Sequence, residues 1–106
     1  MLEFRRKRIA QLTPLAERGD AAAMCRLSEE YANAWGDNIS EQEHIVYASK
    51  ALYWLKRSAE AGFYYAAFEL ANMYENPLGD IRYRIFRPDP ELARKYRALA
   101  EKLRKK

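Results

Sequence analysis

The stretch AEAGFYYAAFELANMY, residues 59–74, is a second copy of AERGDAAAMCRLSEEY, residues 16–31. In both copies alanine, leucine and tyrosine recur at intervals of four, as Ala23, Leu27 and Tyr31 and as Ala66, Leu70 and Tyr74. Residues four apart lie on one face of an α-helix, so each copy predicts a helix with the same buried face. A small residue follows each leucine and would let a neighbouring helix come close; these residues are Ser28 and Ala71.

Each copy opens on Ala-Glu-x-Gly, which places Gly19 and Gly62 where the preceding helix must end, because glycine adopts a left-handed conformation at little cost. Between the copies, Ser40 and Glu43 form a capping box, which predicts a helix from residue 41 to about 61. Its apolar residues form two stripes, Ile45, Ala48, Leu52, Leu55 and Ala59, and Tyr47, Ala51, Trp54 and Ser58. A helix that is apolar on two sides is expected to pack on two sides.

The first and last helices are predicted to be apolar on one side only. Asp89 is a predicted N-cap of the last helix, and Pro90 fits its first position. Its apolar stripe is Leu92, Tyr96, Leu99 and Leu103, and the residues expected to face away are Arg94, Lys95, Arg97, Lys102 and Lys105. In the first helix the inward residues are Phe4, Ile9, Leu12 and Ala16, the outward residues are Arg5, Arg6, Lys7 and Arg8, and Pro14 starts a new turn or kinks the helix. One-sided end helices suit a stacked array, whose terminal units need a polar outer face.

These residues resemble the Sel-one-like repeat (SLR), a relative of the tetratricopeptide repeat. The first part of the family pattern, Ala-x-x-x-Leu-Gly-x-x-Tyr, is matched by Ala23, Leu27, Ser28 and Tyr31, with serine in place of glycine. The second part is matched by Lys50, Ala51, Trp54, Ala59, Glu60 and Gly62, and the second copy supplies Ala66, Leu70, Ala71, Tyr74, Asp89, Ala93 and Tyr96. The loop after each tyrosine is longer than the family's and lacks its regular glycines. The resemblance implies a bacterial adaptor, assembly factor or regulator, and it implies no chemistry.

The repeat and the resemblance together predict one all-α domain over residues 1–106, a short right-handed α-solenoid of antiparallel helix pairs with about five helices. Residues 1–18 are the leading capping helix, residues 20–62 the first repeat, and residues 63–104 the second repeat with the C-terminal capping helix. The chain is expected to be a complete array. Two and a half units are short for stability, so a homodimer is a possible form.

Charge is distributed unevenly along the chain, whose net charge is +4. Residues 1–8 and 94–106 carry a net charge of +9, which leaves −5 for the middle. Basic ends are compatible with nucleic acid or an acidic partner, and equally with solvated ends that keep the protein soluble; we favour the second interpretation. The single cysteine, Cys25, excludes an internal disulfide and favours a reducing compartment, the cytoplasm. No apolar run approaches the roughly 18–20 residues of a membrane span, and the start of the chain does not have the form of a secretory signal.

Catalytic and cofactor motifs are scarce. His44 is the only histidine, and a catalytic base or metal ligand needs companions. Cys25 would need a base to act as a nucleophile, and a small buried cysteine is the simpler interpretation. The sequence has no glycine-rich phosphate loop and no His/Cys cluster. We therefore expect no catalytic residue, no cofactor and no metal, and a protein that is not an enzyme.

Two surfaces are candidates for binding a partner protein. The segment ENPLGDIRYRIFRPDPE, residues 75–91, is long for a helix connection, and its alternating apolar residues predict an extended, half-buried loop with projecting side chains. The partner-binding candidates on it are Arg82, Tyr83, Arg84 and Arg87. In such arrays the first helix of each pair lines the concave side, so either Tyr64 or Tyr65 is expected to face the groove. Structural roles remain open for both sets: a loop with solvated arginines, and packing of either tyrosine in the core.

The resulting hypothesis is a protein–protein interaction module that holds its partner in the groove between the repeated helices, with the Arg82–Arg87 loop as a second wall. A narrower form is a small immunity-type protein that neutralises a toxin. A third hypothesis is a nucleic-acid-binding accessory protein that uses its basic ends, which we disfavour because few aromatic residues accompany them for base stacking. No membrane association is expected.

Overall fold

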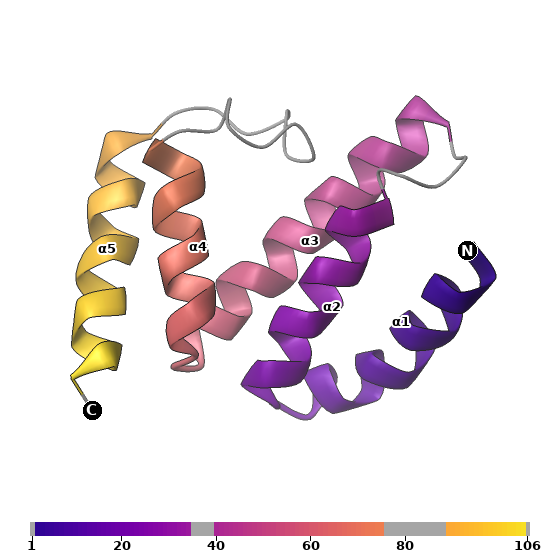
Figure 1. The fold of residues 1–106 in the computed structure, drawn as a ribbon, viewed down its shortest axis with the longest axis horizontal. Coiled ribbons are helices and arrows are strands. Elements are labelled where there is room, and N and C mark those ends of the chain that lie inside the picture. Colours follow the sequence, from indigo (N-terminus) through magenta and orange to yellow (C-terminus); the bar gives the residue numbers. More distant parts are fainter. Residues whose placement is uncertain (1, 35–39, 76–88, 106) are drawn as a thin grey trace.

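A computed structural model describes residues 2–34, 40–75 and 89–105 of the 106-residue chain. These residues form five α-helices and no strand (Figure 1). The helices are α1 (Leu2–Glu17), α2 (Ala21–Asn33), α3 (Glu41–Glu60), α4 (Tyr64–Glu75) and α5 (Pro90–Arg104). The prediction of an all-α fold is confirmed for the part of the chain described.

Side-chain caps begin three of the helices. At α3 the Glu43 backbone N–H donates to Ser40 Oγ at 3.2 Å, and the Ser40 N–H donates to Glu43 Oε1 at 3.3 Å, which completes the predicted capping box. Asp89 caps α5 by accepting from the Leu92 N–H at 3.1 Å, with Pro90 in the first helical position. Asp20 likewise caps α2. Local sequence therefore fixes where these helices start.

The turns before α2 and α4 have the same geometry. Gly19 has φ of 100° and Gly62 has φ of 99°, the left-handed conformation that the Ala-Glu-x-Gly pattern predicts. In the first turn the Asp20 N–H donates to the Leu15 carbonyl at 3.1 Å, and in the second the Phe63 N–H donates to the Ser58 carbonyl at 3.1 Å. This hydrogen bond satisfies a carbonyl at the helix end, as in a Schellman motif. The repeated sequence thus forms a repeated turn.

α3 is the helix buried on two sides, as its two apolar stripes predict. It packs extensively on α2 and also on α4, and the most extensive contacts throughout join helices that are adjacent in sequence. Leu55, Ser58 and Ala59 have no exposed surface. The Ser58 hydroxyl donates to the Ala21 carbonyl at 2.7 Å, so the end of α3 is tied to the start of α2. α3 therefore fixes the positions of α2 and α4.

Two buried clusters make up the core on either side of α3. One joins α1, α2 and α3 and contains Ala16, Ala23, Met24, Leu27 and Trp54. The larger one joins α2 to α5 and includes Leu55, Leu70 and the stacked pair Tyr74–Tyr96, whose ring centroids are 6.1 Å apart. The repeated Ala, Leu and Tyr positions contribute to both clusters, with Tyr31 only partly buried.

The prediction that the apolar stripe of α3 is buried along its whole length is wrong at the first residue, Ile45. Ile45 is 44% exposed, and burial begins at Ala48. α3 has 20 residues and α2 has 13, so at about 1.5 Å per residue α3 is longer by about 10 Å. The N-terminal turns of α3 extend past the end of α2, as Figure 1 shows, and have less helix surface to pack on.

The predicted inward face of α1 is wrong at the start of the helix, where Arg5 and not Phe4 faces inward. Phe4 is 65% exposed, whereas the Arg5 side chain is largely buried and its Nη1 lies 3.1 Å from Glu30 Oε2. The inward stripe is Arg5, Ile9, Leu12 and Ala16, spaced by four, three and four residues. Phe4 precedes this stripe by about 100° of helix rotation.

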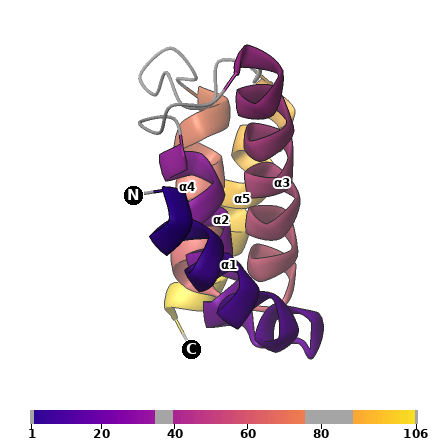
Figure 2. The ribbon, with the colours of Figure 1, turned by 90° about the vertical axis from the view of Figure 1, so that its right-hand side faces the viewer.

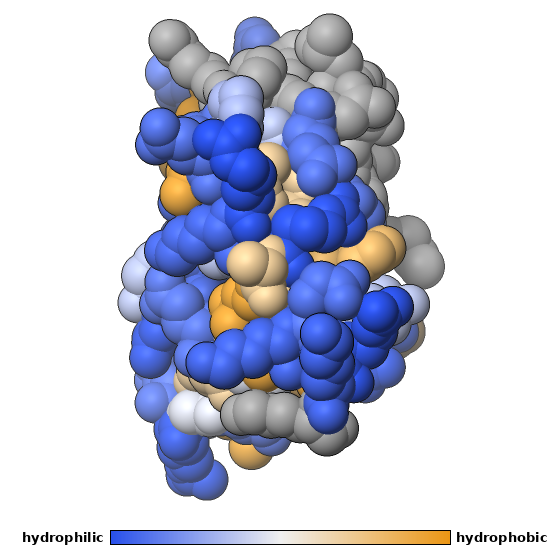
Figure 3. Space-filling model, turned by 90° about the vertical axis from the view of Figure 1, so that its left-hand side faces the viewer, coloured by the Kyte–Doolittle hydropathy of each residue, from blue (hydrophilic) through white to orange (hydrophobic). Residues whose placement is uncertain are grey.

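α5 presents a mostly hydrophilic outer face, as expected of an end helix. Figure 3 views the molecule from the α5 side and shows a hydrophilic surface broken by a small apolar group. Ala93, Tyr96 and Ala100 are buried beneath it. Arg97 departs from the expectation, because it is only half-exposed and its Nη2 lies 2.8 Å from Glu75 Oε1 on α4.

The helices form a thin molecule with two faces. Its principal extents are 38, 31 and 15 Å. Helix axes pack about 8–10 Å apart and Cα atoms lie about 2.3 Å from each axis, so the shortest extent accommodates two helix layers. Figure 2 shows α2 and α4 on one side and α3 on the other, with α1 across the near end. The outer face of α2 is therefore a face on which α3 does not pack.

Substituting alanine at either turn glycine tests the equivalence of the turns. A Cβ at Gly19 would meet nothing within 4 Å, and one at Gly62 would meet only Leu103 Cδ2 at 3.9 Å, so the cost is that of the backbone conformation. We expect Gly19→Ala and Gly62→Ala each to lower the free energy of unfolding by about 1–2 kcal/mol. Glu17→Ala, at the exposed end of α1, is the control and should change it by less than about 0.5 kcal/mol. Urea denaturation measures all three, and a loss at only one glycine would contradict the equivalence.

Candidate functional site

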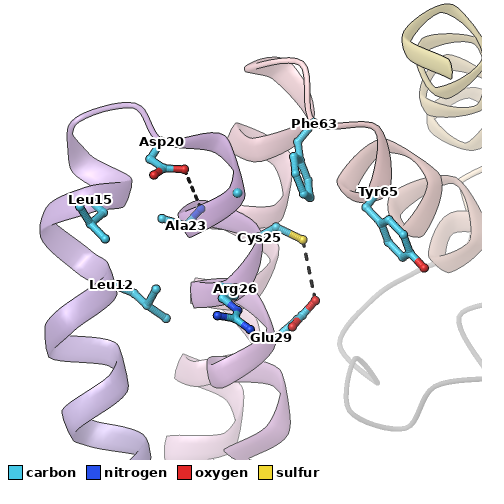
Figure 4. A pocket seen from close by; sticks show the side chains of 10 residues that line it. Leu12, Leu15, Asp20, Ala23, Cys25, Arg26, Glu29, Phe63 and Tyr65 are labelled. Carbon is cyan, nitrogen blue, oxygen red and sulfur yellow. Dashed lines mark hydrogen bonds between the residues drawn. The ribbon is translucent and has the colours of Figure 1, made fainter. Parts of the chain in front are cut away.

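An open groove of about 660 Å³ crosses the outer face of α2 (Figure 4). Leu12 and Leu15 of α1 form one wall. Phe63, just before α4, and Tyr65 of α4 form the other. Cys25 is among the residues of α2 between the walls. The groove therefore joins the leading helix to the starts of both copies of the repeated helix.

The walls of the groove expose apolar surface. Leu15 is 43% exposed and Tyr65 is 63% exposed. Pro14 lies inside α1, directly before Leu15. Exposed apolar surface of this kind gains free energy when a partner removes it from water. Its position on both sides of one groove distinguishes it from scattered surface residues.

The groove continues between α1 and α2 into a more polar hollow of about 630 Å³. The groove and the polar hollow share Leu12, Leu15, Arg26 and Glu29. The residues that only the polar hollow contains are Arg8, Gln11, Glu30 and Asn33. Glu30 accepts from both Arg5 and Arg8, at 3.1 and 3.3 Å. The α1 side of the groove thus combines apolar contacts with a fixed pattern of charges.

Cys25 lies in the groove as a protonated thiol. Its Sγ lies 3.9 Å from Glu29 Oε1, to which it donates, and the residue is buried. Burial, together with the negative charges of Glu29 and Glu69, raises the pKa of Cys25 to about 12. A cysteine nucleophile reacts as its thiolate. The groups around this thiol thus suppress the reactive form, and the expected small buried cysteine is confirmed.

The two tyrosines proposed for the groove lie in different environments. Tyr64 is half-buried, packs against the larger core cluster and stacks on Phe68 with ring centroids 5.9 Å apart. Tyr65 is the exposed tyrosine and lines the groove. The candidates Arg82, Tyr83, Arg84 and Arg87, and the extended loop predicted for them, lie outside the described residues. Their role stays a prediction.

Several groove residues are absent from the sequence-based prediction. Leu15, Arg26 and Glu29 belong to no repeated pattern, and only the packing of α1 against α2 brings them together. Leu15 has one signal in the sequence, because it is a leucine outside the apolar stripe of its helix. Glu29 follows Cys25 by four residues, which places both on one face of α2.

Basic residues at the chain ends are partly neutralised within the molecule. Arg5 and Arg8 pair with Glu30, Arg97 pairs with Glu75, and Arg104 pairs with Glu101 at 3.0 Å. A phosphate backbone would have to compete with these carboxylates for four guanidinium groups. This pairing disfavours the nucleic-acid hypothesis.

Neither a metal cluster nor a membrane helix appears in the part of the chain that the structure describes. Across those residues no three His, Cys, Asp or Glu side chains gather in a way that would hold a metal ion. None of the five helices combines the length and the apolar character of a membrane span. His44, the only histidine, is half-buried in the first turns of α3.

Comparison with known proteins gives no relative. A scan of protein-family models, a search of curated proteins and a search of solved structures each returned no match.

The raised pKa of Cys25 predicts how stability changes at alkaline pH. Folding raises this pKa from its ordinary value of 9.0 to about 12, so the stabilisation is complete below pH 9 and is lost as the pH rises toward 12. We expect the free energy of unfolding to fall more steeply with pH over this interval in the wild type than in Cys25→Ala. Urea denaturation at a series of pH values measures both slopes.

Burial also raises the pKa values of Tyr31 and Tyr96, and these groups titrate in both proteins. The difference between the two slopes therefore isolates the thiol. Parallel slopes would show that Cys25 titrates in the folded protein as it does in the unfolded chain.

Proposed function

We propose that this chain is a non-enzymatic protein–protein interaction module, an adaptor, regulator or inhibitor that holds a partner protein in the groove across α2. The observation that carries the proposal is the pair of exposed apolar side chains, Leu15 and Tyr65, on either side of this groove of about 660 Å³. Tyrosine is enriched in protein interfaces because it offers a large contact area with few rotatable bonds. The groove is open, so it suits a macromolecular segment better than a small enclosed ligand.

The proposed class is a short right-handed α-solenoid of antiparallel helix pairs, related to the Sel-one-like repeats. Two observations support it: the matching glycine turns at Gly19 and Gly62, and the packing of each helix mainly on its neighbours in sequence. Such arrays present an extended concave surface to their partners. In this proposal α2 and α4 are the two repeated helices that line that surface, and the protein acts in the cytoplasm.

The segment Arg82–Arg87 is proposed as a second wall of the binding surface. Its support is composition, since arginine and tyrosine are the residues most often found at the energetic centre of interfaces. Its contribution is separate from that of the groove and is tested separately below.

Substitution of Tyr65 tests the groove directly. The tagged chain recovers its partner from a nuclease-treated extract of the cells that express it, and the amount is measured by quantitative mass spectrometry. We expect Tyr65→Ala to reduce recovery at least about tenfold, as for a central interface tyrosine. Tyr53→Ala is the matched control, because Tyr53 is 54% exposed on α3 and does not line the groove.

Equal recovery by wild type and Tyr65→Ala, or a loss confined to Tyr53→Ala, would remove the groove from the proposal. Reversing the charges of Arg82, Arg84 and Arg87 in the same assay tests the second wall: recovery should fall while the melting temperature stays nearly constant. Recovery of a second copy of the chain alone would identify a homodimer instead of an adaptor.

A further inference from the structure

α3 exposes apolar side chains on the side that faces away from α2 and α4 (Figure 2). Val46 is 49% exposed and Tyr53 is 54% exposed, and the two lie seven residues apart, which is two turns of one helix face. Ser49, also exposed, lies between them. We call Val46, Ser49 and Tyr53 the outer stripe of α3. None of these residues lines the groove across α2, so the outer stripe is a separate surface.

Tyr53 is held in one position by its neighbours on the helix. Arg57 Nη1 donates to the Tyr53 hydroxyl at 3.2 Å, and Arg57 Cζ lies 5.6 Å from the centre of the Tyr53 ring. The ring also packs edge-on against Trp54, at a centroid distance of 5.1 Å, and Trp54 belongs to the core. A side chain that is already fixed loses less conformational entropy when a partner covers it. Tyr53 therefore has the properties of an interface anchor.

The two ends of α3 carry opposite charges. Glu43 lies in the first turn and Arg57 in the last, and neither side chain is buried. Glu43 uses Oε1 in the capping box, and Arg57 uses Nη1 in the hydrogen bond to Tyr53. A carboxylate has a second oxygen, and a guanidinium group has five N–H donors. Both residues can therefore take a further charged partner without giving up these contacts.

The outer stripe and the charged ends are complementary to a second copy of α3 in the opposite direction. Ser49 is three residues after Val46 and four before Tyr53, and residue 50 is seven after Glu43 and seven before Arg57. Two antiparallel helices that cross between residues 49 and 50 therefore place Tyr53 of each copy against Val46 of the other. The same crossing places Arg57 of each copy against Glu43 of the other. The small side chain of Ser49 lets the helices approach closely at the crossing.

From this reciprocity we infer that the outer stripe of α3 is the contact surface between two copies of this chain, which form a two-fold symmetric dimer. Both the apolar and the charged contacts then occur twice, as a two-fold interface requires. Lys50 is also close to the axis, and its Nζ lies 5.5 Å from the centre of the Tyr31 ring, which directs the ammonium group toward α2. The inference goes beyond the proposed function, because the groove lies on the other face of the molecule and stays open in the dimer.

The contact is centred on one helix of 20 residues, about 30 Å long, so it belongs among the smaller specific interfaces. We therefore expect dissociation in the micromolar range. Sedimentation velocity of the full chain over about 1–200 µM measures it, and the dimer fraction should rise with concentration. Tyr53→Ala should weaken dimerisation at least about tenfold, because each dimer loses two anchors.

Tyr65→Ala is the matched control, since Tyr65 is 63% exposed but lies in the groove. It should leave the dimer unchanged. Thermal melts establish that both variants fold. Tyr53→Ala should still recover the partner protein as well as wild type does, because the groove is intact in the monomer.

Cysteine cross-linking tests the antiparallel arrangement independently of any loss of stability. In a Cys25→Ala background, Ser49→Cys should form a disulfide-linked dimer on mild oxidation, because both copies of residue 49 lie beside the axis. Gln42→Cys, also exposed on α3, should not. Its two copies would lie roughly 20 Å apart along the helices, beyond the Cα separation of about 7 Å that a disulfide permits.

The outcomes separate the dimer from the proposed function. A chain that stays monomeric at every concentration, or a dimer that Tyr53→Ala leaves unchanged, would overturn the inference and leave the groove as a binding site. Cross-linking through Gln42→Cys and not through Ser49→Cys would also overturn it, because that pattern requires parallel helices. A concentration-dependent dimer that cross-links through Ser49→Cys and fails to recover any partner would support the inference and contradict the proposed function.

Discussion

α3 packs against α2 on one side and α4 on the other, and the positions of all other helices follow from that double contact. Leu55, Ser58 and Ala59 are fully buried, and two of the three are small, which lets the neighbouring backbones approach closely. The Ser58 hydroxyl donates to the Ala21 carbonyl at 2.7 Å, which satisfies this carbonyl at the start of α2. A larger side chain at Ser58 would separate α2 from α3 and remove this hydrogen bond.

The groove is a consequence of this packing. Because α3 holds α2 and α4 from one face, none of the described helices lies across their other face, and α1 covers only one edge. Leu15 and Tyr65 then lie at the two edges of an open surface. Burial and the charges of Glu29 on α2 and Glu69 on α4 keep Cys25 protonated.

Local features of the fold were predictable from sequence, because they depend on residues close together in the chain. The Ser40–Glu43 capping box, the Asp89 cap and the positive φ of Gly62 are of this kind. The inward face at the start of α1 was not predictable from local sequence. It is set by an ion pair between Arg5 and Glu30, which are 25 positions apart. Hydrophobicity alone predicted that Phe4 would face inward.

Of the residues that line the candidate site, the sequence predicted Tyr65 as one of two alternatives. It did not predict the residues around it. Alternation along α4 limits the groove-facing residue to one of two adjacent tyrosines, since neighbours on a helix point about 100° apart. Leu15 and Glu29 enter the groove only through contacts between helices, which no local pattern encodes. The repeat also predicts likeness between the copies, whereas the groove depends on their differences, such as Tyr65 where the first copy has Ala22.

The central claim is that the α2–α4 face is the surface that meets the partner. Hydrogen–deuterium exchange with mass spectrometry, on the chain alone and on the complex with its recovered partner, tests this most directly. The claim predicts slower exchange on binding in peptides covering α2 and residues 63–69, with little change in residues 41–53 of α3. Slower exchange confined to residues 41–53, or to α5, would place the partner on another face and contradict the claim.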